Sequence, residues 1–322
     1  MAKYDVLVLG EINVDLILAA DEIRPVPGQE RLVDDMALTM GSSSVIFACG
    51  AARLGLRVGF VGVVGDDEFG RFMLQGMAAR GIDVAPVVIA PALKTGITVS
   101  LSTPADRAML TYAGAIAALT AEQVDDTLLE DARHVHVSSF YLQDGLRPGL
   151  PRLLAEARAR GLSVSLDTGY DPRERWAGGL RETLAHVDVL LPNEIEAAAI
   201  SGAAGAIVGA AGAIAGAADP ERALGVLAQQ VPVVAVKLGA EGSIAQKGQE
   251  VVRAAPPAVT PRDTTGAGDS FDAGFVHGFL EGWPLERTLR LACACGALAT
   301  RVPGGTNGQP TLDEAWAAAS GG

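Results

Sequence analysis

The sequence has little cysteine, few aromatic residues and a deficit of positive charge. Its three cysteines, Cys49, Cys293 and Cys295, are an odd number and form no CxxC pair. Neither a disulfide framework nor a cysteine-based zinc site is therefore indicated, and we expect a reducing, cytoplasmic environment. Aromatic residues make up only 5% of the chain. That composition favours close packing of small side chains in an α/β fold over an aromatic-rich β-sandwich.

Acidic residues outnumber basic ones, 38 to 25, which gives a net charge of −13. Nucleic acids and anionic membranes attract proteins with a positive surface, so neither is expected as a partner. The chain has 322 residues, of which 49% are hydrophobic. This is enough for a packed core in one large domain or two small ones.

One long stretch, residues 197–218, contains no charged residue and has the length of a membrane span. It consists mostly of alanine and glycine, however, and it has no flanking basic or aromatic anchors, so its transfer into a membrane is weakly favoured. We interpret residues 203–218 as an Ala/Gly-rich insertion, helical or irregular, without a chemical role.

Apolar runs of strand length alternate with amphipathic segments of helix length along the chain. The predicted strands cover residues 6–9, 58–63, 134–137, 163–166, 187–191 and 233–236. Strands rich in Val, Ile and Leu, separated by helices, predict a doubly wound α/β fold with a mostly parallel sheet flanked by helices. His134 and His136 share one face of a predicted strand, and we assign them a structural role.

Two stretches interrupt this alternation, residues 16–40 and 95–112. In the second, ITVSLS and AMLTY flank the turn residues TPADR, a pattern typical of a β-hairpin. We predict a small antiparallel β lid, formed from about residues 11–40 and 95–113, that covers the functional site.

The clearest helix start lies in the string DTTGAGDSFDAGF at residues 263–275. Phe271, Phe275 and Phe279 recur at i, i+4 and i+8, so they form one apolar helix face. The helix then begins near Gly266, where a Gly-Ala-Gly run leaves backbone N–H groups accessible to a ligand. Because a helix N-terminus also carries about half a positive charge, this start predicts an anion-binding site.

A carboxylate, Asp269, lies in the first turn beside this anion site. It can accept the proton of a hydroxyl that attacks a phosphoryl group held there. A first-turn Asp is also common simply because it satisfies free N–H groups and the helix dipole. The complete string is far more specific than a lone GxGD, and it is not a dinucleotide fingerprint because Phe271 replaces the third glycine.

This string resembles the C-terminal signature of the PfkB, or ribokinase-like, carbohydrate kinases. The resemblance extends over nearly the whole chain, through the segments GEINVDLIL, VGVVGDDEFG, PNEIEA and VKLGAEGS. It implies a single ribokinase-like kinase domain over residues 1–322. It further implies transfer of the γ-phosphoryl group of ATP to a hydroxyl of a small sugar or sugar acid, with ATP and Mg²⁺ as cofactors.

The resemblance also implies roles for residues on the phosphate side of the site. Asp269 corresponds to the catalytic base, and Gly266, Ala267 and Gly268 correspond to the anion hole for the transferring phosphoryl group.

The metal and nucleotide residues follow in the same way. Asn193 and Glu196 match the NxxE motif that organises water and Mg²⁺ near the phosphates; the pair also fits a helix capping box, and both roles can hold. The strand-to-turn segment with Lys237, Gly239 and Gly242 corresponds to the one that passes beside the nucleotide.

A monovalent cation site is implied next to the nucleotide. Thr265 is expected to contact the cofactor and, with Asp263 and carbonyl groups of residues 301–305, to correspond to the K⁺ site of many family members.

On the sugar side, Asn13 and Asp15 match residues that bind hydroxyls, and side chains of this type can each fix more than one hydroxyl. The usual GGxxxN of the family reads GSSSVI here, with Gly41 retained, Ser42 in place of the second glycine and Ile46 in place of the asparagine. Loss of the amide removes a polar contact, so we expect an apolar wall or recognition by residues 42–44. Arg107, in the hairpin turn, makes an acidic sugar admissible.

Two other readings remain open at this point. A nucleoside kinase of the same family would use an apolar base pocket, to which Ile46, Phe140 and Tyr141 could contribute, whereas a non-catalytic sugar or nucleotide sensor would retain the fold without turnover. The exposed edge of a small sheet, together with the family resemblance, predicts a homodimer formed through the lid.

Overall fold

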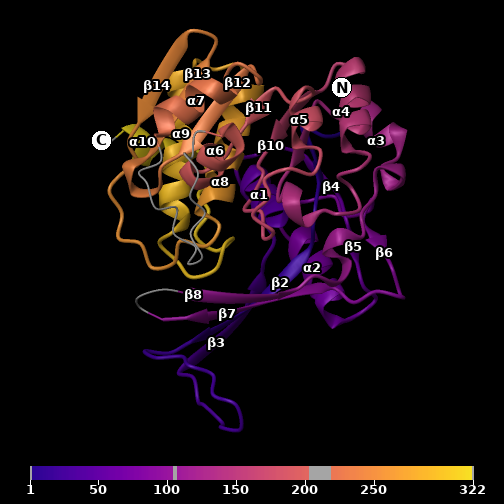
Figure 1. Ribbon diagram of the computed structural model, residues 1–322, viewed down its shortest axis with the longest axis vertical. Coiled ribbons are helices and arrows are strands. Elements are labelled where there is room, and N and C mark those ends of the chain that lie inside the picture. Colours follow the sequence, from indigo (N-terminus) through magenta and orange to yellow (C-terminus); the bar gives the residue numbers. More distant parts are fainter. Residues whose placement is uncertain (1, 104–106, 203–218, 321–322) are drawn as a thin grey trace.

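A computed structural model describes residues 2–103, 107–202 and 219–320. Its centre is an eight-stranded sheet with the order β14-β13-β12-β11-β10-β9-β1-β4 (Figure 1). The strands are β1 (Val6–Leu9), β4 (Val58–Val61), β9 (His134–Val137), β10 (Ser163–Leu166), β11 (Val189–Leu190), β12 (Val233–Lys237), β13 (Ser243–Lys247) and β14 (Glu250–Ala254).

The six strands from β4 to β12 are parallel, as predicted. The antiparallel hairpin β13–β14 that completes this edge of the sheet was not predicted. The run at residues 58–63 also ends earlier than expected, because β5 (Val63–Val64) leaves the large sheet and pairs with β6 (Val88–Ile89).

Helices cover both faces of the sheet, which confirms the doubly wound arrangement. Along β1, Val6 and Val8 belong to one apolar core, and Leu7 and Leu9 belong to the other. The first core is covered by α1 (Ser43–Arg53), α2 (Glu68–Ala78), α8 (Ala267–Leu280), α9 (Leu285–Ala299) and α10 (Leu312–Ser320). The second is covered by α3 (Asp126–Glu130), α4 (Leu150–Ala159), α5 (Leu180–Leu184), α6 (Glu194–Ser201) and α7 (Pro220–Leu227).

A separate four-stranded sheet projects from this body (Figure 1). Its order is β3 (Asp35–Met40), β2 (Asn13–Ala19), β7 (Gly96–Ser102) and β8 (Arg107–Tyr112). The predicted hairpin is present as β7–β8. The sheet is not purely antiparallel, because its two central strands, β2 and β7, both start in the buried part of the body and run outward in parallel.

The register gives the small sheet one polar and one apolar face. Asp15 pairs with Thr39 and Thr98, and Thr98 pairs with Thr111, so these side chains share the polar face. The apolar face carries Leu16, Leu18, Met36, Leu38, Val99, Leu101, Leu110 and Tyr112. Of these, Leu110 is 65% exposed and Met36 59% exposed. Among the residues that the structure describes, the small sheet therefore exposes part of an apolar face to solvent.

The two strand histidines are fully buried and hydrogen-bonded in a line. His134 Nδ1 lies 2.7 Å from Ser163 Oγ, and His134 Nε2 lies 2.7 Å from Ser165 Oγ. His136 Nδ1 lies 2.7 Å from the same Ser165 hydroxyl, and its Nε2 lies 2.7 Å from Ser138 Oγ. Burial lowers the pKa of His134 to about 3 and that of His136 well below its ordinary value, so both imidazoles are neutral.

The predicted Ala/Gly-rich insertion at residues 203–218 lies outside the described residues. Within the described part of the chain, none of the helices combines the length and the apolar character needed to cross a membrane.

Candidate active site

Polar side chains from three neighbouring parallel strands meet at the carboxyl edge of the large sheet, next to the start of α8. Asp167 directly follows β10, Asn193 follows β11 by three residues, and Lys237 is the last residue of β12. The backbone joins these ends, because the Lys237 N–H donates to the Pro192 carbonyl at 2.9 Å. This edge is the usual location of ligand sites in open α/β sheets.

The start of α8 requires glycine at its cap position. Gly266 has φ +74°, and a Cβ there would lie 2.7 Å from the Gly305 carbonyl oxygen. Ala267 and Gly268 then form the first turn with Asp269, as predicted. The Ala267 N–H donates to the Thr264 carbonyl at 3.2 Å, whereas the next N–H groups of the first turn have no acceptor within the helix, so this helix start can receive an anion.

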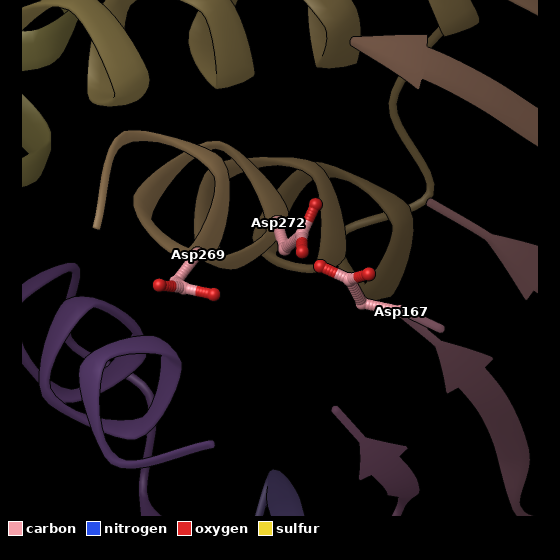
Figure 2. Close-up of side chains that lie close together, drawn as sticks. All are labelled: Asp167, Asp269 and Asp272. Carbon is pink, nitrogen blue, oxygen red and sulfur yellow. The ribbon is translucent and has the colours of Figure 1, made fainter. Parts of the chain in front are cut away.

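Asp269 lies in this first turn and is largely buried, with 9% of the residue exposed. Burial, followed by the negative charge of Asp167, raises the pKa of Asp269 to about 8, whereas Lys237 and a hydrogen bond with Ser43 lower it. One carboxylate oxygen from each of Asp269, Asp167 and Asp272 lies within 4.8 Å of the other two (Figure 2). A carboxyl group with this pKa is suited to exchange a proton near neutral pH.

Lys237 lies between two of these carboxyl groups. Its Nζ is 2.9 Å from Asp167 Oδ2 and 3.1 Å from each carboxylate oxygen of Asp272. Burial favours loss of the charge on Lys237, but the two carboxyl groups outweigh burial and raise its pKa, so the ammonium persists. The single ammonium neutralises only one carboxylate. Burial tends to raise the pKa of Asp167, but the charge of Lys237 outweighs it and holds that pKa low, whereas burial raises the pKa of Asp272.

Asn193 and Glu196 form a complete capping box at the start of α6. Asn193 Nδ2 donates to Glu196 Oε1 at 2.8 Å, the Asn193 N–H donates to Glu196 Oε2 at 3.0 Å, and the Glu196 N–H donates to Asn193 Oδ1 at 2.9 Å. Burial and then the charge of Asp167 raise the pKa of Glu196 to about 7. The capping interpretation is therefore confirmed, and the carboxyl group also lies within electrostatic reach of Asp167.

A cavity of about 540 Å³ opens beside the α8 start. Lys237, Gly239, Gly242, Ala267 and Gly268 line it, so the structure brings these five predicted residues together. The other wall is mostly apolar, from Pro256, Pro257, Ala258, Val259, Phe271 and Cys293. The Gly242 Cα leaves no room for a Cβ beside the Ala254 carbonyl, and its φ is +89°. Such a cavity fits a flat apolar group with a polar or charged end.

The predicted sugar-binding residues form a second cluster on the polar face of the small sheet. Asn13 Nδ2 donates to Asp15 Oδ1 at 3.0 Å and lies 3.5 Å from Thr98 Oγ1. The Asp15 carboxylate packs directly against Gly41, where no Cβ could fit. Asn13, Asp15 and Gly41 are thus adjacent, in a setting that can hold a hydroxylated ligand.

The segment in which this sequence departs from the family pattern begins α1. Ser42 has φ +74°, accepts from the Val45 N–H at 3.1 Å and donates to the Glu11 carbonyl at 2.6 Å. Ser44 Oγ lies 2.5 Å from the buried Glu11 carboxylate, whose pKa is raised by burial. Ser42 and Ser44 therefore make structural hydrogen bonds, and Ser43 is the serine that contacts Asp269.

Ile46 and Arg107 occupy different parts of the molecule. The Ile46 side chain packs against Gly266 and Gly305, and its carbonyl accepts from Gln309 Nε2 at 2.8 Å. Arg107 begins β8 opposite Ser102, and its side chain lies outside the part of the chain that the structure describes.

Asp263 joins the two loops of the expected cation site. Its Oδ1 accepts from the Thr265 N–H at 2.9 Å and the Thr265 hydroxyl at 2.7 Å, and its Oδ2 accepts from the Gly304 N–H at 2.8 Å. Thr264, which the sequence analysis did not select, lines the cavity.

Asp167, Asp272 and Glu11 also lie within reach of Asp269 and were not predicted from the sequence. Asp272 is part of the 263–275 string, one turn beyond Asp269, and Asp167 directly follows a predicted strand. A carboxylate at the carboxyl end of a buried parallel strand was the available signal for Asp167.

Comparison with known proteins agrees with this geometry. The family model of the pfkB family carbohydrate kinases matches residues 3–312. An ATP-dependent ribose-1-phosphate kinase of Halopiger xanaduensis is 31% identical over 316 residues, which cover 96% of this chain and 95% of the relative. A 5-dehydro-2-deoxygluconokinase of Shouchella clausii is 28% identical over 326 residues, covering 97% and 94%.

Solved structures share the fold. An Escherichia coli protein described as a ribokinase II, crystallised with ATP and Mg²⁺, has a TM-score of 0.83 and 26% identity, with 98% of each chain covered.

Proposed function

The chain belongs to the pfkB family of carbohydrate kinases, and from that premise we propose that it transfers the γ-phosphoryl group of ATP to a hydroxyl of a small sugar or sugar acid, with Asp269 as the general base. The observation that carries this proposal is the position of a buried carboxyl group, with a pKa of about 8, in the first turn of the helix that forms the anion site. General base catalysis of this kind typically contributes 10²–10⁴-fold to the rate.

The 540 Å³ cavity is the proposed nucleotide site. Its apolar wall suits the adenine ring, while Lys237, Ala267 and Gly268 line the part proposed for the phosphates. Gly266, the cap of α8, directly precedes them as the remaining residue of the proposed anion hole. Gly239 and Gly242 shape the turn beside the ribose. Stabilisation of the phosphoryl group by fixed donors in a dry site is the largest catalytic effect available to this arrangement.

Glu196 and Asn193 are the proposed Mg²⁺-organising residues. Mg²⁺ prefers oxygen ligands and retains several waters, so a buried carboxyl group with a pKa of about 7 fits contact through water. When bound, the metal neutralises phosphate charge. The residues of this chain then orient the phosphates and exclude water.

Asn13, Asp15, Gly41, Ser42 and Ile46 are the proposed sugar-side residues. Asn13 and Asp15 can each bind ring hydroxyls, because both carry more than one hydrogen-bonding atom. Ser42 and Ile46 are buried, 7% and 3% exposed, so they act by shaping the wall behind the sugar. Arg107 is the proposed partner of an acidic substrate group, and Asp263 with Thr265 remain the proposed monovalent cation site.

The small sheet is the proposed lid, and its apolar face is the proposed contact between two copies of the chain. Leu110 and Met36 are more than half exposed on that face. Burying such a face is favourable by roughly 25 cal/mol per Å² of apolar surface, which supports a homodimer.

The direct test is a panel of sugars, sugar acids and nucleosides incubated with ATP and Mg²⁺, read by ADP release. We expect turnover with a sugar or sugar acid and a loss of about 10²-fold or more in Asp269→Asn, with nucleotide binding retained. Turnover with nucleosides alone would replace the sugar assignment by a nucleoside kinase. A thermal shift with ligands but no ADP release would indicate a sensor, and unchanged turnover in Asp269→Asn would refute the assigned base.

A further inference from the structure

A buried ion cluster lies between the proposed nucleotide cavity and the proposed base. Its ammonium, Lys237 Nζ, is held by Asp167 at 2.9 Å and by both oxygens of Asp272 at 3.1 Å. The three groups come from β12, from the end of β10 and from α8, and their side chains are 12%, 9% and 0% exposed. Lys237 therefore has a single position fixed by two separate elements of the fold.

The ammonium is directed at the anion site. Nζ lies 3.5 Å from the position that a Cβ on Gly268 would occupy, and Lys237 also lines the 540 Å³ cavity. Gly268 and Asp269 belong to the same helical turn, and Asp272 lies one turn further along α8 (Figure 2). One rigid helix thus carries the N–H groups, the proposed base and the carboxyl group that holds the lysine.

We propose that Lys237 is a catalytic residue that contacts the terminal phosphate of the bound nucleotide, and that Asp272 is the positioning residue that holds its ammonium beside Gly268. This inference rests on the proposed kinase function. Beyond the proposed function, Asp272 gains a positioning role and Lys237 contacts the terminal phosphate in particular.

Two physical arguments support this role. A free lysine side chain loses rotamer entropy when it is fixed, and here the fold has fixed it before any ligand arrives. One carboxylate oxygen from each of Asp167, Asp269 and Asp272 lies within 4.8 Å of the others. Asp167, whose pKa is lowered, stays ionised among them, so a phosphate chain entering this region meets negative charge. A fixed ammonium offsets that repulsion at short range, which is the type of preorganised charge that stabilises a transferring phosphoryl group.

The competing explanation is that the cluster only joins β12 to α8. A buried ion pair contributes little net stability compared with apolar residues of the same volume, although removal of one partner is costly. A purely structural role predicts that substitutions change folding and affect all nucleotides equally. A contact with the terminal phosphate predicts discrimination between nucleotides that differ only in that phosphate.

The experiment compares binding of Mg²⁺·AMP-PNP and Mg²⁺·ADP by calorimetry in the full chain. For Lys237→Met we expect the preference for AMP-PNP over ADP to fall by about tenfold or more. Asp272→Asn should reduce the same preference by a smaller factor, and Lys237→Arg should restore part of it. Lys247→Met removes an exposed lysine from the end of β13 and should leave the preference unchanged.

Three further readouts complete the test. The double variant Lys237→Met/Asp167→Asn leaves no buried unpaired carboxylate at Asp167, whose pKa Lys237 otherwise holds low, and it should fold and show the same loss of preference. With the most active sugar of the panel, the acid limb of kcat/KM should move to higher pH in Lys237→Met, because Lys237 lowers the pKa of Asp269. An unchanged preference in the folded variants would overturn the proposal, whereas failure of the wild-type chain to bind either nucleotide would refute the kinase function itself.

Discussion

The side chain of Ile46 packs against Gly266, the residue that caps α8. A Cβ added to Gly266 would lie 2.9 Å from Ile46 Cγ2 and 2.7 Å from the Gly305 carbonyl oxygen. The helix start that carries the proposed anion site is therefore enclosed by an apolar side chain from α1 and by the loop after α9.

Gly266→Ala is expected to abolish most activity because the methyl group has no space. The added Cβ would meet both Ile46 and Gly305, at a φ of +74° that L-residues rarely adopt. The first turn must then shift, and a displacement of about 1 Å can cost 10²-fold in rate. The measurement is kcat in the ADP-release assay together with the thermal unfolding midpoint.

The matched control is Gly282→Ala. Gly282 also has a positive φ, +68°, but a Cβ there meets no atom within 4 Å. Both variants carry the backbone strain, of order 1 kcal/mol, whereas only Gly266→Ala carries the clash. Equal kcat values in the two variants would contradict the proposed importance of the α8 start.

The stability of the protein should depend on the ionisation of Asp269. Its pKa is about 8 in the folded chain against an ordinary value of 3.8. Between these pH values the folded state retains a proton that the unfolded state has released, so the associated stability is lost as the pH rises through about 8. We expect the free energy of unfolding to fall from pH 6 to pH 9 more steeply in the wild type than in Asp269→Asn.

Urea denaturation at both pH values measures this difference. Other titrating groups, including Glu196, are present in both proteins. The difference between the wild type and Asp269→Asn in the pH dependence of the free energy of unfolding therefore isolates Asp269. Identical slopes would show that this carboxyl group is already ionised in the folded state at pH 6.

The shared hydroxyl between the two buried histidines should contribute strongly to stability. Ser165→Ala removes the partner of His134 Nε2 and of His136 Nδ1. Because an unsatisfied buried polar group costs about 1–3 kcal/mol, we expect a loss of about 2–6 kcal/mol in the free energy of unfolding. Ser163→Ala removes only one hydrogen bond from a partly exposed position and should cost less. A larger loss in Ser163→Ala would contradict this account.

The apolar face of the small sheet should determine the oligomeric state. Leu110 and Met109 are neighbours on β8 with similar exposure, 65% and 60%, but they point to opposite faces. Leu110→Glu is expected to yield a monomer in sedimentation equilibrium, because a charge cannot be buried there without a partner. Met109→Glu introduces the same negative charge as Leu110→Glu, but on the polar face, and should leave the dimer intact. The same mass for both variants would refute the proposed interface.

Sequence patterns predicted the parts of this fold that depend on local burial. The bounds of β1, β9 and β10 match the predicted runs because each is a short strand with nearly every residue buried. β1 is apolar throughout, whereas β9 and β10 alternate apolar residues with histidine or serine. The hairpin β13–β14 was overlooked because β14 is the edge strand and is mostly exposed, and β13 ends in polar residues, so the apolar signal of both strands is weak.

The candidate site divides in the same way. The α8 start and the Asn193–Glu196 box are contiguous in sequence, so a local pattern predicts them. The contact of Lys237 with Asp167 depends on strand order, since β10, β11 and β12 lie side by side, and its contact with Asp272 depends on where α8 packs. No local pattern contains that information, and for the same reason the packing of Ile46 against Gly305 could not be read from residues 41–46.

The line of hydroxyls and imidazoles between β9 and β10 behaves as a single polarised unit. Ser165 has one proton, so it donates to one imidazole and accepts from the other. Both neutral rings must then carry the same tautomer, either Nδ1–H in both or Nε2–H in both. If the Ser138 hydroxyl, at the carboxyl edge of the sheet, changes from donor to acceptor, the tautomers of His136 and His134 and the hydroxyl direction of Ser165 must all change with it. The hydrogen bond of Ser163, at the opposite end of the strands, changes direction as well. The ring ¹⁵N shifts of the two histidines should consequently always report one common tautomer.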